Sequence, residues 1–131
     1  MIINSETDYA IRIVSCLADC ENKLDAGTIA ERTGVTQRYA LKILRKLSVG
    51  GIVKSYKGAK GGYALSRKAE DITLLEVIEL ICGTINFSRC QCEQSVCTHP
   101  QGECLFKETF NGVTEFMRRE FKIATFGRKE Y

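Results

Sequence analysis

The sequence lacks the features that mark exported proteins, membrane proteins and most enzymes. Its first residues show no basic stretch leading into an apolar one, so no export signal is visible. No apolar run approaches the length of a membrane span, since even the most apolar segment, residues 74–82, contains Glu76 and Glu79. A single histidine, with no paired carboxylates and no nucleophile constellation, argues against an enzyme. We therefore expect a cytoplasmic protein with no membrane partner and no catalytic residues.

Acidic residues are absent from a long central stretch, residues 32–68, although the whole chain has a formal net charge of only +3. Basic residues are frequent there: Arg32, Arg38, Lys42, Arg45, Lys46, Lys54, Lys57, Lys60, Arg67 and Lys68. A solvated surface usually mixes both signs of charge, so this one-sided charge indicates a face that meets a polyanion. Double-stranded DNA is the partner that such a footprint predicts.

The seven cysteines are unevenly distributed, with a dense group at positions 90, 92, 97 and 104. Because thiols stay reduced in the cytoplasm, this group favours metal binding or redox chemistry over disulfides. Cys16 and Cys20 instead fall on the apolar stripe of a predicted helix, and we interpret them as small buried side chains. Cys82, at the end of another predicted helix, is interpreted as a packing residue, with a position near the metal site as the alternative.

Two short helices separated by a glycine-containing turn are predicted after a first helix at residues 6–20. Asp25 can cap a helix over residues 26–33, and Thr36 can cap a third helix that ends at about Ser48. The pair has the form of a helix-turn-helix, whose second helix enters the major groove of DNA. The residues expected at its base-reading end are Thr36, Gln37, Arg38 and Tyr39.

The rest of this recognition helix separates into a basic side and an apolar side. Lys42, Arg45 and Lys46 lie further along the helix and would more naturally meet phosphates than bases. The apolar stripe expected to face the core is Ala40, Leu41, Leu44 and Leu47.

A β-hairpin is predicted next, because two β-prone runs at residues 52–56 and 63–66 flank the glycine-rich sequence KGAKGG. A hairpin directly after a helix-turn-helix has the position of a wing. Lys57 and Lys60 lie at its tip, where they would follow the DNA backbone or the minor groove.

Two further helices follow. Thr73 and Glu76 have the spacing of a capping box, which opens a helix through Ile81. After the cysteine group, a long helix is predicted from about residue 104 to residue 124. Its apolar stripe is Phe106, Phe110, Val113, Met117, Phe121 and Ala124, widened by Leu105 and Phe116. So apolar a helix should pack against a second copy of itself, which predicts a two-fold homodimer.

The fold class predicted is mainly α with a small β-hairpin wing, in three parts. Residues 1–83 form a winged helix-turn-helix that binds DNA, and residues 84–103 form a cysteine-rich, metal-binding loop. Residues 104–131 form the dimerisation helix and a tail.

The order of these parts resembles the Rrf2 family of bacterial transcription regulators. The resemblance covers nearly the whole chain and rests on TDYAIR at 7–12, IAERTGV at 29–35, LKILRKL at 41–47, KGAKGGY at 57–63 and the cysteine loop. It implies a winged-helix homodimer that binds palindromic operators and senses redox state, nitric oxide, iron or sulfur supply. Sensing would use an iron–sulfur cluster or thiols, and we expect a repressor.

The resemblance also implies a ligand set for a cluster of two or four irons. The family's motif is three cysteines about five residues apart, which Cys92, Cys97 and Cys104 match best, with Cys90 as an alternative first ligand. The fourth ligand stays open. Lys107 stands where some members have a histidine, whereas Asp8 stands where others use an acidic residue from the partner subunit. His99 and Cys90 are the remaining candidates.

Other readings of the cysteine loop remain open. Zinc ranks second, because zinc prefers four firm ligands in paired spacings and the pairs at 90/92 and 97/99 are too tight. A regulator without a cofactor, in which neighbouring cysteines oxidise, ranks third. The fold could also serve as a scaffold that binds a regulatory protein partner instead of an operator.

Overall fold

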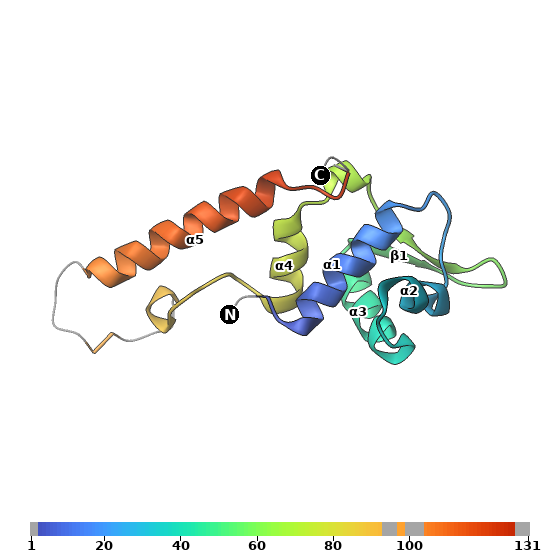
Figure 1. Cartoon of the computed structure of the whole chain (residues 1–131), viewed down its shortest axis with the longest axis horizontal. Helices are drawn as coiled ribbons and strands as arrows, with labels where there is room; N and C mark the ends of the chain where they lie inside the picture. Colours follow the sequence, from blue (N-terminus) through green and yellow to red (C-terminus); the bar gives the residue numbers. More distant parts are fainter. Residues whose placement is uncertain (1–2, 93–96, 99–103, 128–131) are drawn as a thin grey trace.

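The computed structural model describes residues 3–92, 97–98 and 104–127, and these form helices with one small hairpin (Figure 1). The helices are α1 (Ser5–Ala18), α2 (Ala26–Thr33), α3 (Gln37–Val49), α4 (Leu74–Cys82) and α5 (Leu105–Ile123), with single 3-10 turns at η1 (Ala69–Asp71) and η2 (Arg89–Gln91). The strands are β1 (Val53–Tyr56) and β2 (Gly62–Leu65). Helices α1–α4 and the hairpin form one body, from which α5 extends (Figure 1). The predicted fold class is confirmed.

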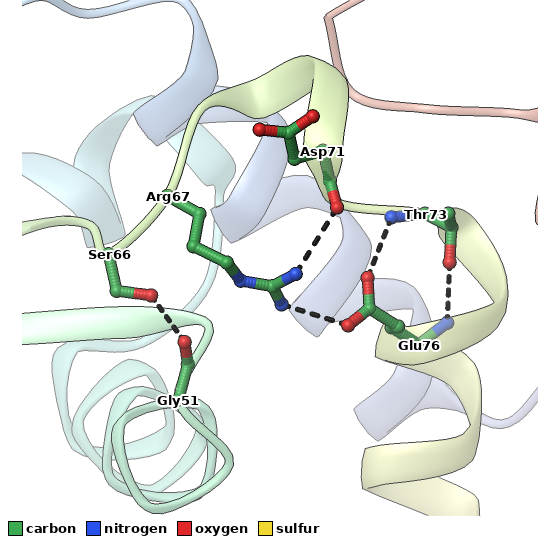
Figure 2. Close-up of polar contacts among 6 residues, drawn as sticks. All are labelled: Gly51, Ser66, Arg67, Asp71, Thr73 and Glu76. Atoms are coloured by element: carbon green, nitrogen blue, oxygen red, sulfur yellow. Dashed lines mark hydrogen bonds and ion pairs between the residues drawn. The ribbon is translucent and has the colours of Figure 1, made fainter.

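The helices begin where their capping residues stand. Asp25 Oδ1 accepts a hydrogen bond from Thr28 N at 2.8 Å, and Thr36 Oγ1 accepts one from Tyr39 N at 3.3 Å. The capping box at Thr73 is complete, because Thr73 and Glu76 each satisfy the other's backbone N–H (Figure 2). The three caps expected from the sequence are confirmed.

The turn between α2 and α3 depends on Gly34. This residue ends α2 in the left-handed conformation, with φ 72° and ψ 19°. Its N–H donates to Ala30 O at 3.0 Å, which satisfies one of the last carbonyls of α2. Because residues with a side chain rarely adopt this φ, glycine permits the sharp change of direction that a helix-turn-helix requires.

The core lies where α1, α2 and α3 pack together, with the start of the hairpin and α4. Its fully buried side chains include Ile13, Ile29, Ile43, Leu44, Leu47, Ile72 and Val77. The expected stripe of α3 was wrong at one position, since Ile43 is fully buried while Leu41 is 43% exposed. Ala40, Ile43, Leu44 and Leu47 follow the helical spacing of three and four residues, and Leu41 lies outside that face. On α4, Leu75 is buried, whereas Leu74 and Ile81 are only half-buried.

The hairpin is attached to the helical body at both of its strands. β1 and β2 pair antiparallel from Val53↔Leu65 to Tyr56↔Gly62. Tyr63 exchanges backbone hydrogen bonds with Leu24, in the connection between α1 and α2. A side chain at position 62 would collide with that connection, since a Cβ there would lie 2.8 Å from Leu24 O. Gly62 therefore lets the hairpin sit close against the helix-turn-helix.

The long helix α5 has two adjacent apolar faces instead of the single stripe expected. Phe110, Thr114, Met117 and Phe121 face the rest of the chain and are half-buried or buried. Phe121 packs against the cluster of Leu75, Ile78 and Ile85. A second set of side chains points to solvent: Leu105, Phe106, Val113, Phe116 and Ile123 are each 45–73% exposed. One face of α5 thus belongs to its own subunit, and the other is uncovered.

The segment after α5 returns to the start of α4 (Figure 1). Leu74 N donates to Ala124 O at 2.9 Å and Phe126 N donates to Ile72 O at 3.1 Å, on either side of a bridge between Thr73 and Thr125. Phe126 also packs against the main core. The far end of α5 is thereby fixed to the helical body that carries the helix-turn-helix.

Candidate nucleic-acid interface and cysteine loop

The first turn of α3 presents polar side chains to solvent, as expected of a recognition helix. Thr36, Gln37 and Arg38 are exposed, and they stand at the N-terminal end, where a helix in the major groove meets base edges. Arg38 can make paired hydrogen bonds to guanine, and Gln37 can make them to adenine. The sequence-predicted reading end is therefore accessible.

Tyr39 differs from its neighbours because its ring is half-buried. It meets the ring of Tyr9 edge-on, with the ring centres 5.5 Å apart, which braces the start of α3 against α1. Lys42 Nζ lies 5.4 Å from the centre of the Tyr39 ring, one turn further along the same side of the helix. Lys42 thus remains exposed beside the first turn, while the ring of Tyr39 is held against α1.

Two of the three basic residues expected to meet phosphates remain available for that role. Lys42 and Arg45 are exposed on α3. Lys46 forms an ion pair with Glu6 of α1, and its expected contact with phosphate stays a prediction. The pair links the recognition helix to the first helix of the chain.

The hairpin turn places two further ammonium groups beside the helix-turn-helix. Lys57 and Lys60 are both exposed in the turn between β1 and β2. Lys23 and Lys54 lie over the ring of Tyr56 at the end of β1, with their Nζ atoms 4.1 and 5.5 Å from the ring centre. The strand that leads into the turn is therefore lined with positive charge. This arrangement suits a wing that follows phosphates.

Arg67, just beyond β2, anchors the base of the wing to α4. Its Nη2 donates to Glu76 Oε1 at 2.8 Å, and its Nη1 donates to Asp71 O at 3.2 Å (Figure 2). Ser66 beside it donates to Gly51 O, at the end of α3 (Figure 2). Burial acts to raise the pKa of Glu76, but the hydrogen bonds from Arg67 and Thr73 N outweigh it, so this pKa lies below its usual range. Arg67 therefore links the base of the wing to the capping box of α4.

The cysteine loop begins beside the start of α5. Cys90 is half-buried and its Sγ lies 2.8 Å from Ser88 Oγ, while Cys92 is exposed and accepts from Asn86 Nδ2 at 3.8 Å. Cys97 is exposed, and Cys104 is half-buried at the N-cap of α5. His99 lies outside the described residues. None of the seven cysteines, all of which are described, forms a disulfide.

Gln91, between two of the candidate ligands, holds this part of the loop in place. Its Oε1 accepts from Phe87 N at 2.7 Å and from Ser88 N at 3.1 Å. Its Nε2 donates to Asn111 Oδ1 at 3.1 Å and to Thr114 Oγ1 at 2.9 Å, both on α5. One amide therefore closes the turn before the cysteines and attaches that turn to the helix.

The donor chemistry of the loop fits an iron–sulfur cluster, because thiolates are the ligands that such clusters take. Within residues 3–92, 97–98 and 104–127, however, no three histidine, cysteine or acidic side chains are gathered closely enough to hold a metal ion. Asp8, the expected fourth ligand, forms an ion pair with Arg12 Nε at 3.0 Å. The ligand set thus stays a prediction.

The sequence patterns did not reveal three residues that make contacts in the candidate sites. Gln91 was overlooked between two cysteines, and Thr114 was overlooked because it is a polar residue on an apolar helix. Arg32, counted only as part of the basic stretch, donates to Cys20 Sγ at 3.0 Å. Cys82, expected to pack in the core, is exposed, with its Sγ 3.0 Å from Ile78 O.

Known proteins match this chain in sequence and in fold. The sequence profile of the Rrf2 family, described as iron-dependent transcriptional regulators, matches residues 3–128. Protein aau3 of Rhizobium meliloti (strain 1021) is 32% identical over 91 residues, which cover 69% of this chain and 59% of that protein. The HTH-type transcriptional regulator IscR of Photorhabdus laumondii is 30% identical over 93 residues, which cover 70% and 57%. These matches span less than two thirds of either relative.

A solved structure extends the agreement to the fold. The structure of CymR (YrzC), the global cysteine regulator of B. subtilis, superposes with a TM-score of 0.78 at 23% identity, covering 95% of this chain and 92% of that one. Across the described residues, no helix is long and apolar enough to cross a membrane.

The helix-turn-helix with its exposed first turn, followed by a basic hairpin, defines a winged-helix transcriptional regulator. The family profile spans almost the whole sequence, and the chain belongs to the Rrf2 family. Members of this family are described as transcriptional regulators, which agrees with the class of protein predicted from the sequence.

Proposed function

We propose that this regulator represses transcription by binding a palindromic DNA operator as a homodimer, under the control of an iron–sulfur cluster in its cysteine loop. The observation that carries the DNA-binding part is the exposed first turn of α3 beside a basic wing. Thr36, Gln37, Arg38 and Tyr39 would read bases, and Lys42, Arg45, Lys57 and Lys60 would contact phosphates. No acidic residue interrupts the stretch that carries them.

The proposed homodimer rests on the uncovered face of α5. Phe106, Val113, Phe116 and Ile123 recur at seven, three and seven residues, which is the spacing of a helix that packs along another helix. They are 73, 45, 58 and 52% exposed, respectively. Large apolar side chains that are exposed together on one face normally mark an interaction surface. A second copy covers this face in a two-fold arrangement. Two recognition helices would then meet two half-sites about 34 Å apart along the DNA.

The proposed cluster site uses Cys92, Cys97 and Cys104, with Asp8 of the partner subunit as the fourth ligand. Support comes from the three thiols of the loop and from the description of the family as iron-dependent. When bound, the cluster would supply iron–thiolate bonds that oxygen or nitric oxide attack. Asp8 pairs with Arg12 through Oδ2, so its other carboxylate oxygen is the one that would serve as a ligand. Cys90 and His99 remain the alternative ligands.

Two sets of contacts would transmit a change in the loop to the DNA-binding residues. Gln91 fixes the loop to the middle of α5, and the backbone pairing of Phe126 with Ile72 fixes the end of α5 to the core. On the opposite side, Glu6 joins α1 to Lys46 of the recognition helix. A shift of α5 or α1 therefore changes the placement of α3 within the dimer. Because two half-sites must be met together, a coupling of about 1–3 kcal/mol changes affinity by about 5- to 150-fold.

The proposal is tested by DNA binding as a function of salt. A duplex selected from random sequence by the oxygen-free protein should be palindromic. If the dimer makes about six phosphate contacts, the logarithm of its affinity should fall with the logarithm of salt concentration with a slope of about −5. Absence of any selected sequence, or a flat salt response, would contradict the operator proposal.

A second function, regulation by thiol oxidation without a cofactor, is favoured by one specific observation. The described residues do not gather three metal ligands in one place. CymR, a global cysteine regulator by its title, shares the fold of this chain. In this alternative the loop thiols would form disulfides with one another or with small thiols. Zinc-loaded protein without iron would instead support the zinc reading, and capture of a protein partner without operator binding would support the scaffold reading.

A further inference from the structure

A second pair of thiols lies far from the cysteine loop, where α1 ends beside α2. Cys16 is in the last turn of α1, and Cys20 follows two residues after the helix ends. Both are half-buried, and Arg32 Nη1 of α2 donates to Cys20 Sγ at 3.0 Å. The sequence reading of these cysteines as buried hydrophobic side chains is therefore wrong, because neither is fully buried and one carries a charge-assisted contact.

A cavity of about 590 Å³ gives small molecules access to this pair. Its lining includes Cys16, Cys20, Arg32, Arg12 and Asp19. A metal ion suits the site poorly, since the guanidinium of Arg32 would repel a cation and no third ligand is gathered within the part of the chain that the structure describes. The site instead suits chemistry in which negative charge develops on sulfur, and thiol oxidation is chemistry of that kind.

The two thiols are not equivalent. Burial raises the pKa of the Cys16 thiol, and the neighbouring Cys20 and Asp19 raise it further, against an opposing effect of Arg32. Cys16 therefore keeps its proton at neutral pH. The N–H of Arg32 points at the sulfur of Cys20, where it can stabilise negative charge when that sulfur acts as a nucleophile. These environments assign attack on an oxidant to Cys20 and the second step to Cys16.

We propose that Cys20 and Cys16 form a peroxide-reactive thiol pair, assisted by Arg32, that closes to a disulfide within one subunit. The Cys20 thiolate attacks hydrogen peroxide, so that an S–O bond forms, the O–O bond breaks and hydroxide leaves. The sulfur of Cys16 then attacks the sulfenic acid of Cys20. The S–S bond forms as the S–O bond breaks, and the hydroxyl leaves with the proton of Cys16 as water. Two thiols are oxidised by two electrons, and one peroxide is reduced.

Closing this pair requires a local movement of the chain. Side chains one helical turn apart have Cβ atoms about 5–6 Å apart, whereas the Cβ atoms of a disulfide lie about 3.5–4.5 Å apart. Because Cys20 lies beyond Ala18, the last residue of α1, the non-helical segment after the helix can supply the movement. Closure also removes the Cys20 thiol to which Arg32 donates. Arg32 stands two residues before Gly34, in the turn between α2 and α3. This proposal depends on neither the DNA-binding nor the cluster proposal.

The test uses the full chain. Digestion with trypsin then places the relevant cysteines in separate peptides. Cleavage after lysine and arginine places Cys16 and Cys20 in peptide 13–23, Cys82 in peptide 69–89 and the loop cysteines in peptide 90–107. Reduced protein is treated with equimolar hydrogen peroxide, its remaining thiols are alkylated, and the peptides are weighed. We expect peptide 13–23 to lose two hydrogens and to resist alkylation. Full alkylation of both its cysteines would overturn the proposal.

Variants separate the roles of the three residues. In Cys16→Ser, Cys20 should accumulate as a sulfenic acid that a dione probe traps. Arg32→Gln should slow closure about tenfold, the effect of losing one charge-assisted hydrogen bond, and Arg32→Lys should restore part of the rate. Arg12→Gln is the matched control, because it removes the same charge from the same cavity without touching Cys20. Equal rates in Arg32→Gln and Arg12→Gln, with all variants folded by circular dichroism, would overturn the role of Arg32.

Discussion

Gln91 donates a hydrogen bond of 2.9 Å to Thr114, and this bond joins the cysteine loop to the long helix. Thr114 is the buried residue of α5, at 7% exposure, so the bond is partly buried. The same amide group accepts from the backbone of Phe87 and Ser88. The loop is thus joined to α5 by the side chain of Gln91, next to the stacked rings of Phe87 and Phe110, whose centres are 6.5 Å apart.

Replacing Gln91 should loosen the loop without unfolding the helical body. Gln91→Ala removes four hydrogen bonds, so the amides of Phe87 and Ser88 should exchange with deuterium faster, while the amides of α1–α3 keep their protection. Thr114→Val is a partial control, because it keeps the shape of the side chain and removes only the acceptor on α5. It should accelerate the same amides less. Unchanged exchange in Gln91→Ala would show that other contacts hold the loop.

Arg38 and Lys60 should affect DNA binding in different ways. Arg38→Ala should lose about 1–3 kcal/mol of discrimination at one operator position, because a base contact disappears. Lys60→Ala should weaken binding to every sequence alike and reduce the salt slope by about 1. Fluorescence anisotropy with the operator, single-base variants and an unrelated duplex distinguishes the two. The reverse pattern would mean that the wing, and not α3, reads the sequence.

The capping box of α4 should make stability depend on pH. The pKa of Glu76 is lower in the folded chain than in the unfolded one, so its carboxylate stabilises the fold above the unfolded pKa, and this contribution is lost as pH falls through the folded pKa. Glu76→Gln should therefore lower the midpoint of thermal unfolding near neutral pH, with a difference that shrinks below about pH 4. Glu31→Gln, at an exposed position on α2, is the control for the loss of one carboxylate from the chain. Thr73→Ala should cost about 1 kcal/mol through loss of the cap.

A charge on the uncovered face of α5 should separate the subunits. Phe116→Asp puts a carboxylate where we expect apolar contact between two copies, and it should weaken the dimer by at least about tenfold. Lys107→Asp is the matched control, because position 107 is also exposed but lies about two and a half turns away, on the opposite side of the same helix. Sedimentation velocity measures both. A wild-type chain that sediments as a monomer at high concentration would contradict the dimer proposal.

Local features of the sequence predicted most of the fold. Asp25, Thr36 and Thr73 cap the helices as expected, because capping depends on residues three positions apart. The wing was predicted from two β-prone runs on either side of a glycine-rich turn. The apolar spacing of α5 predicted a long amphipathic helix but not its division into two faces. That division depends on which neighbour, α4 or another subunit, covers each side, and a single helix carries no such information.

The candidate sites were less predictable, since they depend on contacts between distant residues. Gln91 and Thr114 are 23 positions apart, and Arg32 reaches Cys20 across 12 positions. The basic stretch was visible as composition, but only the fold showed that Lys46 forms an ion pair with Glu6 while Lys42 stays exposed. Residue types therefore indicated the chemistry, and the tertiary contacts decided which residues are free to perform it.

The iron and acid-labile sulfide content of protein prepared without oxygen tests the central claim most directly. The account predicts a brown wild-type protein that contains both elements, a colourless Cys97→Ala variant, and an unchanged Cys82→Ala variant, which controls for loss of an exposed thiol outside the loop. Wild-type protein without iron, or Cys97→Ala protein with as much iron as wild type, would contradict it.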